Sequence, residues 1–198
     1  MRISAAVGAL SALFLIPCFA GDLEDGIKFH EHKAYAKAAI AFQRAAVSGN
    51  SEAQRRLGFM YYHGEGVAPD NRKAVILFEQ AAAAGDILSA SNLAKMYEYG
   101  MSVAQDDTRA AAWYEKAANM GDPVSQFNTS IMYYKGQGVP QDRVQAEKWW
   151  TLAMMQGGEF AETVHRSVES AEAKLTPEEI AEGKRRAEEW VTARKTKK

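Results

Sequence analysis

A repeat of 36 residues constrains this chain more than any other feature. Four glycines recur at that spacing, and one methionine, one tyrosine, one valine, one aspartate and one alanine keep the same register between them. The glycines are Gly49, Gly85, Gly121 and Gly157. Units of this length bury their apolar faces only by stacking on their neighbours. The sequence therefore predicts an elongated array.

Each unit is predicted to contain two antiparallel helices. Helix A of the first full unit is expected from a cap at Asn50 to about Tyr62, with Gly64 taking the left-handed conformation that ends it. Helix B is expected to start at the cap Asp70, to carry apolar residues at helical spacing, and to stop at Gly85. The predicted fold is all-α, a right-handed α-α superhelix of antiparallel helix pairs.

Two segments carry a resemblance to a known family. LGFMYYHGEGVAPDNRKAVILFEQAAAAGD and MYEYGMSVAQDDTRAAAWYEKAANMGD closely resemble the Sel1-like repeat (SLR), a relative of the tetratricopeptide repeat with a longer loop between its helices. The resemblance covers roughly residues 22–157. One departure is Ser102, which stands where the neighbouring loops have their second glycine.

The register divides the chain into four parts. Residues 1–20 are predicted to be a signal peptide, 21–49 a truncated N-terminal repeat, 50–157 three 36-residue Sel1-like repeats, and 158–198 C-terminal capping helices. Thr176, Pro177 and Glu179 form a capping-box pattern before the final helix. That helix is expected to cover the exposed end of the array with Ile180, Ala187 and Trp190, and the chain is expected to fray from Lys195.

The N-terminal segment predicts export. An uncharged apolar run from Ile3 to Ile16 is followed by small residues, so cleavage is expected between Ala20 and Gly21, giving a periplasmic or secreted protein. The run is too short to span a membrane, and no second candidate follows. Cys18 leaves an alternative open, a lipid anchor to the envelope, although Pro17 does not fit a lipobox.

Charge and motifs argue against several function classes. The chain has 24 Lys and Arg against 25 Asp and Glu, so no field of one sign favours a nucleic-acid partner. His30 and His32 are two residues apart and fall on different sides of a helix, which disfavours a shared metal site. No motif of a nucleophilic, zinc or phosphate-binding enzyme is present. No catalytic residue, metal or cofactor is predicted.

The family resemblance implies where a partner binds. In tetratricopeptide arrays successive A helices line a concave groove, and the shared register carries its positions onto this chain. The side chains expected to contact a protein or peptide partner are Arg55, Phe59, Tyr62, His63, Lys95, Tyr99, Phe127, Ile131, Tyr134 and Lys135. Such a face suits an extended peptide with apolar anchors and a carboxylate, although aromatic residues in stacked repeats also serve as packing.

Three functions follow from the sequence. The leading hypothesis is an exported, non-catalytic protein-interaction module, whose partner and oligomeric state the sequence does not name. A hydrolytic envelope enzyme is an alternative, because cysteine-rich relatives are associated with beta-lactam binding or hydrolysis, but their paired cysteines are missing here. The third is a structural or assembly lipoprotein anchored at Cys18.

Overall fold

The structure is an all-helical array, as the repeat register predicts. The computed structural model describes residues 21–196, and the predicted signal peptide, with Ala20 and Cys18, lies outside them. Those described residues form ten helices and no strand. The helices are α1 (Asp22–Glu31), α2 (Tyr35–Val47), α3 (Ser51–His63), α4 (Asn71–Ala83), α5 (Ile87–Tyr99), α6 (Asp107–Met120), α7 (Pro123–Lys135), α8 (Arg143–Met154), α9 (Gly158–Glu172) and α10 (Pro177–Lys195).

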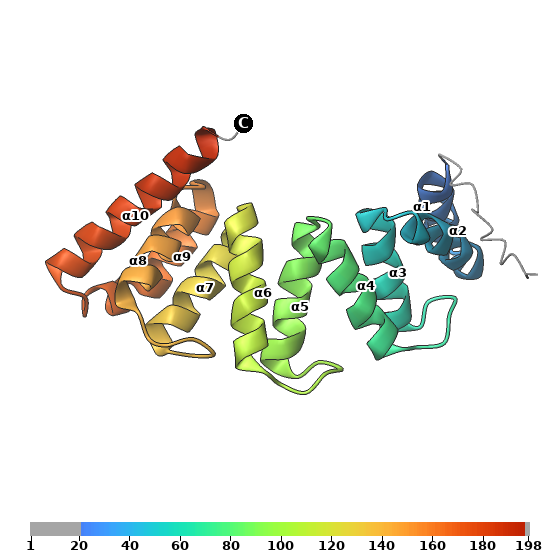
Figure 1. Ribbon diagram of the computed structural model, residues 1–198, viewed down its shortest axis with the longest axis horizontal. Coiled ribbons are helices and arrows are strands. Elements are labelled where there is room, and N and C mark those ends of the chain that lie inside the picture. The colour runs from blue at the N-terminus through green and yellow to red at the C-terminus, as the bar shows by residue number, and fades with distance from the viewer. Residues whose placement is uncertain (1–20, 197–198) are drawn as a thin grey trace, which may run out of the picture.

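The helix pairs stack in chain order along one axis. Figure 1 shows the array running from α1 and α2 at one end to α8, α9 and α10 at the other, with the three long loops after α3, α5 and α7 on the same side. The A helices of the full units are α3, α5 and α7, and their B helices are α4, α6 and α8. The N-terminal unit is the shortened pair α1 and α2. The predicted fold class is confirmed.

Helix boundaries follow the predicted caps. The side chains of Asn50, Asp86 and Asp122 accept backbone N–H bonds at the start of α3, α5 and α7. Asp70, Asp106 and Asp142 do the same for the B helices. These oxygens satisfy amides that have no partner within the helix. The A helices end at Gly64, Gly100 and Gly136, each in the left-handed region with φ of 73°, 64° and 68°.

The second loop glycine lets each loop approach the previous helix B. A side chain at Gly66 would collide with the backbone of Tyr35 at the start of α2, and one at Gly138 with the backbone of Asp107 at the start of α6. Ser102, at the same register position, adopts a positive φ of 69° despite its side chain. The backbone conformation is therefore kept in all three loops, at some cost in strain at Ser102.

The core runs along the array in layers. One large aromatic ring from each helix B is fully buried between the helices, namely Phe78, Tyr114 and Trp150. Alanines on the same helices are also fully buried, and their small side chains allow the close helix contacts that fill the interior. Because each layer is built from one unit and its neighbours, no single central core is needed.

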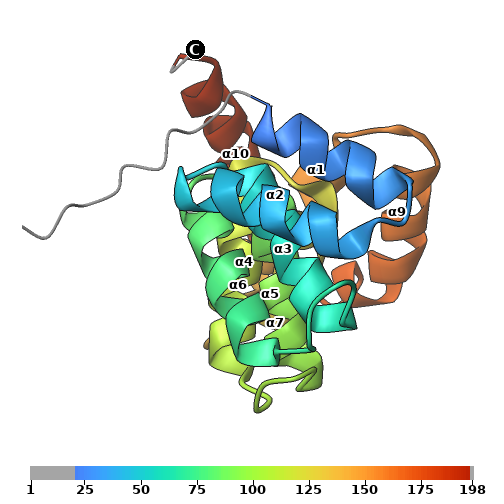
Figure 2. The same ribbon diagram turned by 90° about the vertical axis from the view of Figure 1, so that its right-hand side faces the viewer.

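The two C-terminal helices lie on opposite sides of the array. Viewed from the N-terminal end, α9 and α10 project to different sides (Figure 2). α9 follows α8 in the helix A position, whereas α10 packs along α8 and reaches the end of α6. Ala187 is fully buried and Trp190 lies 6.4 Å from Trp149, but they pack along α6 and α8 and not, as predicted, over the exposed end of the array; Ile180 packs on a separate cluster beside α9.

Two details at the C-terminus can be compared with the sequence prediction. The capping box at Thr176 and Glu179 is present, with both reciprocal hydrogen bonds formed. The expectation that the chain frays from Lys195 is wrong for that residue, because α10 includes it and Thr196 caps the helix. Arg194 explains the difference, since it is tied to the carbonyls at the end of α6 and holds the last turn in place.

Candidate partner-binding surface

The residues predicted to bind a partner all lie on α3, α5 and α7. The shared register places them at matching positions of these three A helices, along one side of the array. The structure groups most of them around two hollows, one between α3 and α5 and one between α7 and α9. We call this side the A-helix face.

The first hollow is lined mainly by aromatic side chains. It has a volume of about 190 Å³ and lies between α3 and α5. The Phe59 ring meets Phe78 edge-on at 5.0 Å and stacks against His63 at 6.2 Å. Tyr62 meets His63 edge-on at 4.9 Å. The exposed Lys95 stands at its margin on α5, so an apolar floor lies next to a positive charge.

The second hollow repeats this arrangement two units further along. It has a volume of about 300 Å³ and is lined by Phe127, Ile131, Tyr134 and Lys135 from α7, together with α9 residues around Val168. Phe127 and Tyr134 are half-buried against the core of the C-terminal end. They therefore serve packing as well as offering part of their surface to solvent.

Tyr99 and Glu98 lie at the end of α5, which stands between α3 and α7 along the chain. Tyr99 is 66% exposed and is the most accessible of the predicted aromatic residues. Its neighbour Glu98 accepts a hydrogen bond of 2.7 Å from the buried Tyr114 hydroxyl. Burial, together with that bond, raises the pKa of the Tyr114 phenol, and the charge of Glu98 raises the pKa of Tyr99. Both tyrosines therefore stay protonated hydrogen-bond donors at ordinary pH.

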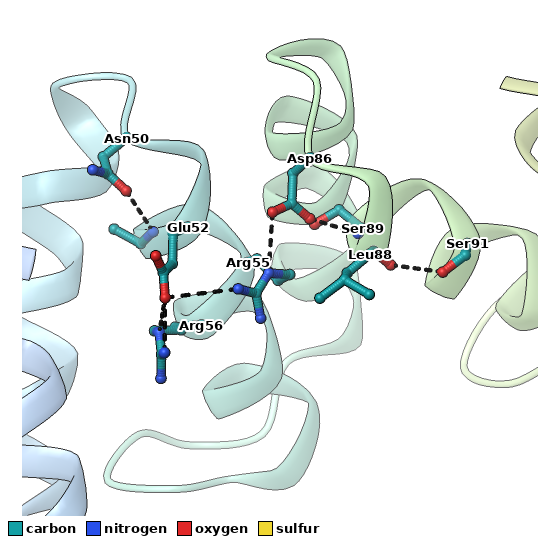
Figure 3. A network of polar contacts seen from close by, with 9 residues as sticks. Asn50, Glu52, Arg55, Arg56, Asp86, Leu88, Ser89 and Ser91 are labelled. Carbon is teal, nitrogen blue, oxygen red and sulfur yellow. Dashed lines mark hydrogen bonds and ion pairs between the residues drawn. The ribbon is translucent and has the colours of Figure 1, made fainter. Parts of the chain in front are cut away.

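Arg55 has a different setting from the one the sequence suggests. Its Nε donates to Asp86 at 3.1 Å, and its side chain is only 18% exposed (Figure 3). Asp86 also caps α5 through a 2.7 Å bond from the Ser89 amide. The same network includes Glu52, which pairs with Arg56 at 2.7 Å. Arg55 therefore links the first full repeat to the second, and its guanidinium is already paired with the Asp86 carboxylate.

The structure also adds residues that the groove prediction missed. Phe78 and Trp150, the aromatic rings contributed by the B helices, reach the floors of the two hollows. Their shared register position was visible in the sequence, but it gave no sign that the rings reach the A-helix face. Asn92, Met96 and Met101 complete the first hollow, and residues of α9 complete the second.

The histidines show no shared site. His30 lies 3.0 Å from Glu65 through its Nε2, and His32 Nδ1 lies 2.7 Å from the Lys28 carbonyl oxygen. In the part of the chain that the structure describes, no three side chains of the metal-binding types come together. Among helices of residues 21–196, none has both the length and the apolar character needed to cross a membrane.

Comparison with known proteins gives the family. The Sel1 repeat profile matches residues 51–86, 87–122 and 123–158, which are the units that the register and the helix pairs delimit. The chain belongs to the Sel1 repeat family. Members of this family are generally non-catalytic scaffolds that mediate protein–protein interactions. No curated protein matches the chain.

Two solved structures share the Sel1 fold. One is c5321, described as a protective antigen of uropathogenic Escherichia coli strains with an SLR fold; it is 30% identical, with a TM-score of 0.70, over 85% of this chain and 37% of that one. A Sel1 repeat protein from Oxalobacter formigenes is 25% identical, with a TM-score of 0.64, over 70% of this chain and 57% of that one. This Sel1 repeat chain therefore covers less than two thirds of the length of either relative.

Proposed function

We propose that this Sel1 repeat protein is an exported, non-catalytic interaction module that binds an extended peptide segment of a partner on its A-helix face. The observation that carries the proposal is the pair of aromatic-lined hollows on that face, built at the same register two units apart. An extended peptide that follows the array can place one apolar side chain in each hollow. Recognition of this kind relies on a few aromatic anchors rather than on total contact area.

The charges on this face favour carboxylates on the ligand. Lys95 and Lys135 stand beside the hollows and are exposed, and among residues 21–196 neither has a carboxylate within ion-pair distance. Arg55 is taken up by Asp86. We therefore assign partner attraction to the two lysines and inter-repeat stability to Arg55. Exposed charges at a rim act mainly on the association rate and its salt dependence.

A pull-down with paired variants tests the binding face. The wild-type chain and a Tyr62→Ala, Tyr134→Ala double variant are used as baits in extract of the source organism, and affinities for recovered partners are then measured with purified proteins. Loss of the two anchors is expected to weaken binding by about 1 to 3 kcal/mol. Met155→Ala is the matched control, because Met155 is an exposed apolar residue outside both hollows.

Each bait must first show an unchanged melting temperature, because Tyr134 also packs against Trp150 at 6.1 Å. A folded double variant that binds its partners with wild-type affinity would show that the A-helix face is not the binding surface. Measuring the affinities of Lys95→Ala and Lys135→Ala at several salt concentrations then separates the electrostatic attraction by the lysines from the apolar contacts of the aromatic anchors. Only the electrostatic attraction weakens steeply with ionic strength.

Export is tested independently of binding. Cell fractionation, intact mass and N-terminal sequencing are expected to find a mature chain that begins at Gly21. A lipid-modified chain that begins at Cys18 would replace this proposal with the anchored alternative. A chain that keeps Met1 and stays in the cytoplasm would contradict both.

A further inference from the structure

The opposite side of the array, formed by the B helices, carries three equivalent clefts. Each lies between two successive B helices and above a tyrosine of the intervening helix A: Tyr61 between α2 and α4, Tyr97 between α4 and α6, and Tyr133 between α6 and α8. Because the tyrosines are 36 residues apart, residues of one cleft can be compared directly with those of the next. The three clefts are closed to different degrees.

The third cleft is covered by α10. Ala187 of α10 is fully buried in one cluster with Ala118, Trp149 and Leu152, and Trp190 and Val191 pack against the same cluster. At the end of α6, Trp190 Nε1 donates to Asn119 Oδ1 at 3.4 Å and Arg194 donates to the Met120 carbonyl oxygen at 3.0 Å. This cleft thus shows how an amphipathic helix sits on the B-helix face.

The middle cleft is closed by its own side chains. Trp113 stands at the register position of Trp149 and packs against the central core. Lys116 Nζ lies 4.9 Å from the centre of the Trp113 ring, and the Arg109 guanidinium lies 5.3 Å from the Tyr97 ring and donates to its hydroxyl. A cation also lies over the tyrosine of the first cleft, where Lys73 Nζ is 5.0 Å from the centre of the Tyr61 ring, so the side chain that closes the middle cleft is Trp113.

The first cleft is open. Two adjoining hollows of about 450 and 390 Å³ share Gln43 and Tyr61 as lining residues. Leu77 takes the place of Trp113 and Trp149, which leaves the space that their rings occupy in the other clefts. Its borders are exposed apolar side chains: Ile40 is 56%, Val47 72% and Ile76 51% exposed. Isolated apolar side chains on a surface are ordinary, but three around two adjoining hollows, Val47 and Ile76 at one and Ile40 at the other, are typical of an interaction site.

We propose that the cleft between α2 and α4 docks an amphipathic helix of a partner protein, with an apolar stripe toward Tyr61 and acidic residues along its flanks. The docking mode is argued from α10, which covers the equivalent cleft two units away. An apolar helix face laid into a groove between helices is a recurrent mode of recognition.

The charges around the cleft select an acidic partner. Lys73 and Arg44 are the charged residues that line the two hollows, and no carboxylate lines either of them. Both side chains are more than half exposed, although each also pairs with a neighbouring aspartate at 3.5 Å, Lys73 with Asp70 and Arg44 with Asp22. A helix with glutamates on its flanks finds complementary charge on both sides of the cleft.

A second copy of this chain is a poorer occupant. Its most suitable helix, α10, already buries Ala187 on its own α8 and ties Arg194 to its own α6, so it would have to leave that site first. α10 also carries lysines and arginines as well as glutamates, which the basic border of the cleft would repel in part.

A designed helical peptide tests the proposal. The probe copies the α10 segment from Thr176 to Lys195, keeps its apolar stripe, replaces Ala187 by leucine to fill the wider space, and carries glutamate at all exposed charged positions. A second peptide carries lysine at those positions. Binding of each labelled peptide to the full chain is measured by fluorescence anisotropy, and the acidic peptide is expected to bind at least about tenfold more tightly.

Two protein variants locate the binding site. Ile76→Glu places a negative charge on the border of the open cleft and is expected to weaken the acidic peptide at least about tenfold. Ala112→Glu is the matched control at the same register position on α6, beside the closed middle cleft, and is expected to leave binding unchanged. Both positions are exposed, so the melting temperature is expected to stay close to that of the wild type.

Several outcomes would overturn the proposal. They are the absence of binding by the acidic peptide, equal or tighter binding of the lysine peptide, and equal loss in the two variants. Light scattering of the full chain adds another: a dimer that Ile76→Glu dissociates would show that a second copy covers the cleft. None of these results tests binding at the A-helix face, which the Tyr62→Ala, Tyr134→Ala double variant tests separately.

Discussion

The two ends of the B-helix face have the same backbone register and opposite surfaces. Between α2 and α4 the outer positions are Ile76, Leu77 and Gln80, whereas between α6 and α8 they are Lys148, Trp149 and Leu152. At the C-terminal end α10 buries the tryptophan and the leucine completely, and at the N-terminal end the corresponding cleft is open. In this array the repeat sets where a cleft lies, and a few outer side chains set what can cover it.

The largest expected difference is in how much the side chain at one register position contributes to the free energy of unfolding. Trp149 is fully buried under α10, and Leu77 at the same register position is half-buried beside the open cleft. Trp149→Ala is expected to lower the free energy of unfolding by about 3 to 5 kcal/mol, as for a fully buried aromatic residue. Leu77→Ala should cost about 1 kcal/mol, since only part of its apolar area is removed from water.

Urea unfolding followed by circular dichroism measures both variants. The slope of the free energy against urea concentration serves as the control, because a change in slope would indicate loss of two-state behaviour in an elongated array. Equal destabilisation by the two variants would contradict the expectation that Trp149, buried under α10, contributes more to stability than the half-buried Leu77.

A second difference is a buried carboxyl group at the C-terminal end. Glu147 is fully buried on α8, where the other repeats have Val75 and Ala111, and Gly183 of α10 lies directly against its side chain. The Trp150 Nε1–H and the Thr151 hydroxyl donate to its carboxyl group, the latter at 2.9 Å. Burial raises the pKa of Glu147 above its usual value near 4.5, in spite of these two bonds.

A raised pKa at Glu147 predicts that the stability of the folded chain depends on pH. Between about pH 4.5 and the raised pKa, the folded chain keeps a proton that the unfolded chain has released, so stability falls as the pH rises through that window. The fall is at most about 1.4 kcal/mol per pH unit for one proton. Glu147→Gln keeps the acceptor for Trp150 and removes the titration, so its stability is expected to be flatter across the window and higher than that of the wild type above it.

Thermal unfolding of both proteins from pH 4 to pH 8 tests this expectation. Glu79→Gln is the control, because it makes the same substitution on α4, beyond the region that α10 covers. Parallel curves for the wild type and Glu147→Gln would contradict a raised pKa at this position.

The smallest expected effect concerns the end of α6. Arg194 donates to the carbonyl oxygens of Asn119 and Met120, which would otherwise face solvent at the helix C-terminus. Arg194→Ala is expected to cost about 1 kcal/mol, the typical value for hydrogen bonds from an exposed charged donor. Hydrogen exchange of the amides in the last turn of α10 measures the loss, and Lys195→Ala is the neighbouring control. Unchanged protection would show that apolar packing alone holds this end of α10.

Much of the A-helix face follows from the sequence. The register of glycines and aspartates fixes where the helices begin and end, because these residues are required by local backbone geometry and by unpaired amides. It also places Phe59, Tyr62, Phe127 and Tyr134 on one side of the array. That these residues bind a partner stays a prediction, and the structure adds that each pair borders a hollow.

Contacts between residues far apart in the chain could not be predicted from the sequence pattern. Arg55 has the position of a ligand-binding residue, but its side chain pairs with Asp86, which lies 31 residues further along the chain. No local pattern distinguishes a cation that faces a ligand from one that meets the cap of the next repeat, because the difference depends on how two units pack. The same is true of the rings of Phe78 and Trp150, which cross from helix B to the floor of the A-helix face.

The sequence alone determined the repeat length, the helix boundaries, the caps and the family, since these depend on residues close together in the chain or on their regular recurrence. Only the tertiary structure decided that α10 lies on the B-helix face rather than continuing the stack beyond α9, and that it thereby covers one cleft of three. The physical reason is that α10 has no repeat register to follow. Its place is set by the fit of Ala187 and Trp190 against Trp149, a contact between segments that the chain order does not bring together.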